Sequence, residues 1–191
     1  GQFATRSDNS LHVHPTPDFH GTMGIIVEAR DPEGGITGYN HFTLTVTPIN
    51  DLPTLAALAN LTLDEDATEQ TVNLSGITAG GSESQPLRVT ASSSNTDLIA
   101  NPAVTYTSAE ATGSSTFTPA SEQSGSAVIT VTVEDGGLDG DINTAGDNLS
   151  HSETLTVTVS PVNDLPTLAS IQDLKFNPNA PEHTVRLAGI T

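Results

Sequence analysis

The chain contains no cysteine and no tryptophan, and only five lysines and arginines stand against 23 acidic residues, which gives a formal net charge of −18. Without cysteine there can be neither a disulfide nor a thiolate metal site. The shortage of basic residues excludes nucleic acid as a partner, because phosphate binding requires a basic surface. No apolar run approaches the roughly 18 residues of a membrane-spanning helix, so no membrane span is expected.

Large side chains are scarce as well, since aromatic residues make up 4% and hydrophobic residues 35% of the 191 positions. This composition favours small β-sandwich cores of Val, Ile, Leu and Thr over one large core. Neither a Gly-x-Ser-x-Gly elbow nor a phosphate-binding glycine loop is present, and we predict no enzymatic activity. His12 and His14 share one strand face but lack a third zinc ligand, so we interpret them as surface residues.

An internal repeat organises the sequence. The segment from Asn50 to Ala56 recurs from Asn163 to Ala169, an offset of 113 residues, and 16 of the 29 positions from 50 to 78 are identical to their counterparts. Upstream the offset is 104, carried by Pro15, Gly21 and Asp31 against Pro119, Gly125 and Asp135. The difference of nine residues predicts an insertion within 136–150, and length changes are typical of loops.

From these offsets we interpret residues 1–49 as the C-terminal part of one repeat, 50–162 as a complete repeat, and 163–191 as the N-terminal part of a third. A partial repeat would leave its apolar face exposed. We therefore expect the natural protein to extend in both directions. The alternative is that the partial units of neighbouring chains complement each other.

Alternating apolar and polar residues predict an all-β fold. Ile129, Val131 and Val133 alternate with threonines, and no segment has a helical stripe. We expect seven strands in the complete repeat, a pattern typical of an immunoglobulin-like β-sandwich, near 54–63, 70–77, 86–92, 103–107, 114–118, 126–133 and 152–160. Pro48 and Pro161 end the last strands, and proline in the Asn-Asp-Leu-Pro connector predicts a short extended link. The repeats should then be joined end to end.

Oxygen-bearing side chains fall at two junctions of this predicted array, because alternate loops of an antiparallel sandwich lie at opposite ends. The first joint should receive Asp18, Asn50, Asp51, Glu83 and Asp135, and the second Glu65, Glu122, Asn163 and Asp164. Calcium binds six to eight oxygens, mixing carboxylates and carbonyls. We therefore predict a calcium site at each joint. The alternative is that these acids are solvated or cap turns.

The long loop after residue 135 carries a second calcium-like signal. Asp139, Asp141 and Asn143 have the spacing of the first ligands of a calcium-binding loop. Thr144 stands where the sharp-turn glycine belongs, and Ser150 stands where the bidentate glutamate belongs. We therefore favour an ordinary polar loop.

The joint sequence Val162-Asn163-Asp164-Leu165-Pro166 resembles the Asn-Asp-x-x-Pro linker of cadherins, with the proline one residue earlier. Glu65 is similar to the cadherin glutamate after the first strand, and Asp31 and Asp135 are similar to the acid of the F–G turn. In place of the cadherin Asp-x-Asp motif the chain has Ser82-Glu83. In place of Leu-Asp-Arg-Glu it has only Asp18 or Glu122.

A closer resemblance is to bacterial cadherin-like and immunoglobulin-like tandem repeats of very large surface proteins. It is carried by residues 87–95, by Phe117-Thr118-Pro119 and by the Asn-Asp-Leu-Pro joints, and it covers nearly the whole chain. The resemblance implies an extracellular, cell-surface location and calcium dependence.

The expected function is a non-enzymatic structural or adhesive stalk, with calcium at the joints. Its partners would be neighbouring repeats and other copies in a fibre or matrix, and its surface or glycan ligand is left open. The alternative is a carbohydrate-binding or spacer module of a secreted enzyme. The scarcity of aromatic side chains, which sugar-binding faces usually expose, favours the stalk. A glycan-array screen would distinguish the two.

Overall fold

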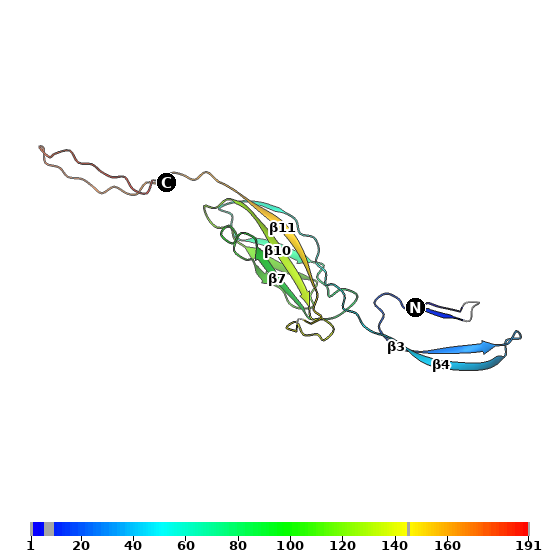
Figure 1. The fold of residues 1–191 in the computed structure, drawn as a ribbon. Helices are drawn as coiled ribbons and strands as arrows, with labels where there is room; N and C mark the ends of the chain where they lie inside the picture. Colours follow the sequence, from blue (N-terminus) through cyan, green and yellow to red (C-terminus); the bar gives the residue numbers. More distant parts are fainter. Residues whose placement is uncertain (1, 6–9, 145, 191) are drawn as a thin grey trace.

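The computed structural model of the chain describes residues 2–5, 10–144 and 146–190. Its regular structure consists of β-strands throughout this part of the chain. None of these residues belongs to a helix that is long and apolar enough to cross a membrane. Figure 1 shows a central β-sandwich, with two hairpins of the N-terminal part on one side and the C-terminal segment on the other.

The central sandwich has two sheets built from seven strands. The four-stranded sheet has the order β5-β11-β10-β7, and the three-stranded sheet has the order β6-β9-β8. Neighbouring strands are antiparallel except β5, which runs parallel to β11. The all-β prediction is confirmed. The seven strands are β5 (Leu61–Asp64), β6 (Gln70–Ser75), β7 (Leu87–Ser93), β8 (Ala103–Thr105), β9 (Thr112–Phe117), β10 (Gly125–Asp135) and β11 (Ser150–Ser160).

The first strand differs from the expected continuous strand over 54–63. Thr54 forms an isolated bridge with Thr78 beside the smaller sheet, whereas the ladder with β11 covers only Leu61–Asp64. Between these points the chain crosses from one sheet to the other. At the crossing, the side-chain oxygen of Asn60 accepts a hydrogen bond from the backbone N–H of Thr156 at 2.8 Å. The crossing interrupts regular pairing, although the sequence remains rich in apolar residues.

The core lies between the sheets and follows the predicted alternation. Val131, Val133 and Val157 are completely buried, and Ile129 lies directly opposite Leu155 in the β10–β11 ladder. Burying side chains of this size contributes about 1.5–3 kcal/mol each to folding. The opposite sheet and its loops supply Leu74, Ile77, Leu98, Ile99 and Phe117. This packed centre fixes the positions from which the loops leave each end of the sandwich.

The N-terminal part consists of two antiparallel hairpins. β1 (Gln2–Thr5) pairs with β2 (Leu11–His14), and β3 (Gly21–Arg30) pairs with β4 (Ile36–Val46). Five residues connect β3 to β4, whereas fourteen connect β10 to β11. The nine extra residues therefore lie in a loop, as the two sequence offsets predict.

Local backbone geometry recurs at the offsets found in the sequence. Asp18 and Glu122, which are 104 residues apart, both have left-handed φ angles, of 61° and 56°. At the offset of 113, Gly76 and Gly189 have φ angles of 66° and 65°. The Ala169 N–H donates to the Ala188 carbonyl at 3.0 Å, as Ala56 does to Ser75 at 2.9 Å. The sequence repeat thus has a counterpart in conformation.

Candidate functional site

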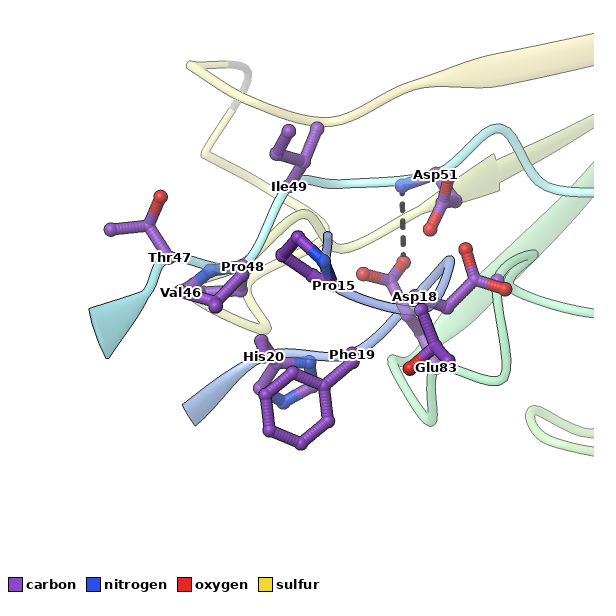
Figure 2. Close-up of a pocket in the computed structure, with 12 residues that line it drawn as sticks. Pro15, Asp18, Phe19, His20, Val46, Thr47, Pro48, Ile49, Asp51 and Glu83 are labelled. Atoms are coloured by element: carbon purple, nitrogen blue, oxygen red, sulfur yellow. Dashed lines mark hydrogen bonds between the residues drawn. The ribbon is translucent and has the colours of Figure 1, made fainter. Parts of the chain in front are cut away.

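The first joint brings together three carboxylates from three separate segments. Asp18 comes from the turn before β3, Asp51 from the linker after β4, and Glu83 from the loop between β6 and β7. Figure 2 shows these side chains beside one another in the lining of a cavity of about 230 Å³. The Asp51 backbone N–H donates to Glu83 Oε2 at 3.2 Å. The structure therefore places these three predicted residues around one cavity.

The turn that carries Asp18 has an unfavourable backbone conformation. Left-handed φ angles are uncommon for residues other than glycine and cost on the order of 1–3 kcal/mol when the structure enforces them. The Phe19 N–H closes this turn on the Thr16 carbonyl at 3.3 Å. Glu122 has the same conformation at the other end of the sandwich. An acidic residue in this strained position is thus common to both joints.

Asp135 forms the buried end of the first joint. Its side chain has no solvent exposure. Oδ1 accepts three hydrogen bonds, from Asn50 Nδ2 at 3.0 Å, Gly137 N at 3.0 Å and Leu149 N at 2.9 Å. Oδ2 is also buried but has no hydrogen-bond partner among the described residues. Because buried polar atoms nearly always have a partner, this oxygen is an exception that a further donor or a cation would satisfy.

Asn50 links Asp135 to the loop between β6 and β7. Its Nδ2 also donates to the Asp147 carbonyl at 2.9 Å, and its Oδ1 accepts from Gln85 Nε2 at 2.6 Å. Gln85 Nε2 donates in addition to Glu83 Oε2 at 2.8 Å. We call this hydrogen-bonded set of Asn50, Glu83, Gln85 and Asp135 the amide network. It ties the linker to both neighbouring loops.

Sequence reasoning missed Gln85 and Asp147. The spacing of Gln85 is a usable signal, because it lies two residues after Glu83 and just before β7. In an extended chain, side chains two residues apart point to the same side. Asp147 offers no such signal, since it contributes a backbone carbonyl to Asn50 and its side chain accepts from Leu138 N.

The linker also passes very close to two glycines. Gly80 and Gly81 have positive φ angles of 88° and 41°. A Cβ atom on Gly80 would overlap the Leu52 carbonyl oxygen, and one on Gly81 would overlap the Asp51 carboxylate. Glycine allows both the conformation and the close approach. The position of Asp51 in the joint thus depends on two residues without side chains.

The second joint gathers acids at the opposite end of the sandwich. Glu65 is 7% exposed, and its Oε1 accepts from the Val162 backbone N–H at 2.8 Å. The pKa of Glu122 is raised, chiefly by the negative charge of Asp164, then by partial desolvation and by the charges of Asp66 and Glu65. These four carboxylates are therefore electrostatic neighbours, and of the acidic run at residues 64–66 the sequence analysis names only Glu65 as a site residue. Asn163 is exposed, and its side-chain amide donates to the Asp164 carbonyl at 3.4 Å.

Carboxylates alone do not form a metal cage at either joint. Within residues 10–144 and 146–190, no three Asp, Glu or His side chains lie close enough together to hold a metal ion. A cation at either joint would need additional oxygens from amides, backbone carbonyls or water, which calcium accepts readily.

The acids of the long loop between β10 and β11 organise the loop itself. Asp139 Oδ1 accepts from Asp141 N at 2.8 Å, and Asp141 Oδ1 accepts from Asn143 N at 3.0 Å. The pKa of Asp141 is lowered, first by the Asn143 backbone N–H and then by the Thr144 hydroxyl. These contacts are turn-capping bonds, as expected of an ordinary polar loop.

No family model matches the sequence, and no curated protein matches it. Among solved structures, domains 4 and 5 of the S-layer protein SbsC are 13% identical, with a TM-score of 0.39 over 82% of this chain and 78% of that one. The human mucin-like protocadherin EC1-2 is 15% identical, with a TM-score of 0.46 over 84% and 78%. SbsC domains 1–6 are 12% identical, with a TM-score of 0.39 over 85% and 23%. These similarities are distant and concern the arrangement of strands.

Proposed function

We propose that this chain is a non-enzymatic segment of an extracellular structural or adhesive stalk, made of tandem immunoglobulin-like repeats whose joints are stiffened by calcium. One observation carries the proposal. Acidic side chains gather at both ends of one sandwich, where the chain enters it at Asp51 and leaves it at Asp164. Carboxylates that only kept the surface soluble would have no reason to concentrate at these two places.

The tandem arrangement is supported by the agreement between sequence and conformation. The repeat at an offset of 113 residues includes Gly76 and Gly189, and both adopt the same left-handed conformation. In each copy the glycine lies against an alanine, Ala56 or Ala169, whose Cβ would be 3.3 or 3.2 Å from an added side chain. We infer that the two segments begin equivalent domains.

The residues at the joints fit calcium by their chemistry. At the first joint Asp18, Asp51 and Glu83 line one cavity, and an ion there would need amide, carbonyl or water oxygens besides these carboxylates. At the second joint Glu65, Glu122 and Asp164 would supply only part of the ligand set, and other oxygens would have to complete it. When bound, calcium supplies a double positive charge that accepts several oxygen ligands at once. The chain itself contributes the convergence of these acids and, at Asp18 and Glu122, the strained turns that present them.

Calorimetry and small-angle X-ray scattering on the whole chain test this proposal. Calcium that binds only the folded chain at about 100 times its dissociation constant adds about 2.7 kcal/mol to the free energy of unfolding. We expect calcium added after chelator treatment to raise the melting temperature and to narrow the distribution of maximum dimensions. Magnesium, which prefers a rigid octahedral site, serves as the control and should have a weaker effect. Identical melting and scattering in chelator and in calcium would refute the calcium joint.

A further inference from the structure

At the first joint, amide groups occupy the space between acids that would otherwise repel each other. Glu83 and Asp135 both lie near the linker, and each receives hydrogen bonds from a side-chain amide. Gln85 Nε2 bridges Glu83 Oε2 at 2.8 Å and Asn50 Oδ1 at 2.6 Å. Asn50 Nδ2 bridges Asp135 Oδ1 at 3.0 Å and the Asp147 carbonyl at 2.9 Å. All four acceptors of these two amides are oxygen atoms.

Backbone N–H groups also donate to the carboxylates of Glu83 and Asp135 and so add to the stabilisation of their negative charge. Glu83 Oε2 also accepts from Asp51 N, and Asp135 Oδ1 also accepts from Gly137 N and Leu149 N. Hydrogen bonds to an ionised carboxylate are roughly twice as strong as bonds between neutral groups. The linker residues Asn50 and Asp51 are thereby attached to the two loops at this end of the sandwich without any ion.

We propose that the Gln85 carboxamide takes the place of a cation on this side of the first joint, so that the linker stays attached to the sandwich in the absence of metal. Its Nε2–H groups contact Glu83 Oε2 and Asn50 Oδ1 at the same time, so the positive end of the amide dipole is shared by two oxygens, as a cation would be. The inference concerns the same joint as the proposed function, but it stands or falls separately, because it describes the state without calcium.

Amide hydrogen exchange measured by NMR on the whole chain in chelator tests the proposal. The Asp51 amide, which bonds to Glu83, reports on the linker. The Val131 amide in the central strand β10 reports whether the sandwich is folded. In the unaltered chain both should be protected. Gln85→Ala removes the bridging donors and should speed exchange at Asp51 about fivefold or more, since a hydrogen bond to a charged group is lost, with Val131 unchanged.

Gln85→Glu gives the sharper result. It places a third carboxylate beside Glu83, so Asp51 should lose its protection in chelator and regain it when calcium is added. Gln172→Glu makes the same charge change at an exposed position of the C-terminal segment and should leave exchange at Asp51 unaltered.

Two outcomes would overturn the inference. The first is an Asp51 amide that exchanges equally fast in the unaltered chain and in Gln85→Ala. The second is a Gln85→Glu chain whose Asp51 amide stays protected in chelator, because the amide donors would then not be needed to hold the linker. A chain whose melting ignores calcium but whose Asp51 protection depends on Gln85 would refute the calcium joint and uphold this inference.

Discussion

At the scale of single residues, the first joint depends on a glycine as much as on its acids. In Gly80→Ala, the left-handed conformation and the overlap with the Leu52 carbonyl both act against the folded state. We expect a loss of about 2–3 kcal/mol in the free energy of unfolding, measured by urea denaturation. Gly140→Ala is the matched control, because Gly140 has a φ of 71° but open space around it, and it should cost about 1 kcal/mol. Equal losses would contradict the close approach of the linker.

Glu122 gives the second joint a pH dependence of known sign. Its folded-state pKa is raised, mainly by Asp164, so the folded chain binds the proton more tightly than the unfolded chain. The contribution to stability is therefore present at low pH and is lost as the pH rises from about 4.3, the ordinary glutamate value, through the raised pKa. In Glu122→Gln, the melting temperature should fall less over this range than in the unaltered chain. Glu33→Gln makes the same charge change at the exposed β3–β4 turn, away from the second joint, and serves as the control variant.

The sequence predicts the acidic residues of the joints better than their partners. The sequence predicts Asp18, Asp51 and Glu83 at one joint because alternate loops share an end of a sandwich, and the structure brings them into one cavity. Gln85 was not expected, because an uncharged amide resembles any other polar loop residue until its contacts are known. The role of Asn50 also differs in detail, since all of its side-chain polar atoms are used in hydrogen bonds.

At the scale of elements, alternation located every strand of the central sandwich. The alternation does not show where the first strand changes sheets. The residues before the crossing and those after it both pack against the core, so both are apolar. The side-chain pattern therefore continues through 54–63 although regular pairing does not. The location of the insertion was predictable for a simpler reason, since strand length is fixed by the core and loop length is not.

On the central strand β10, sensitivity to substitution should depend on which face a side chain occupies. Val131 is fully buried, whereas Val128 on the same strand is 39% exposed. Val131→Ala should lower the free energy of unfolding by about 2 kcal/mol, because it loses apolar burial and leaves a cavity. Val128→Ala should change it by less than about 0.5 kcal/mol. Urea denaturation of both variants tests this alternation. Similar losses in the free energy of unfolding would contradict the assignment of Val131 to the core face and Val128 to the outer face.

At the scale of the whole molecule, the three parts follow one another from the N-terminal hairpins through the sandwich to the C-terminal segment (Figure 1). The central sandwich is connected at its two opposite ends, through the linker at Asn50 and Asp51 and through the segment after Ser160. Both joints are therefore anchored to the same packed core.

The parallel pairing of β5 with β11 has a mechanical consequence. The chain enters β5 from the first joint and leaves β11 at the second, and the two strands are paired from Leu61 with Val157 to Asp64 with Ser160. A pull along the chain draws these strands in opposite directions along their own length. Their hydrogen bonds then carry the load together in shear, instead of opening one after another as in a zipper. The order of the strands in this sheet therefore favours resistance to stretching along the chain.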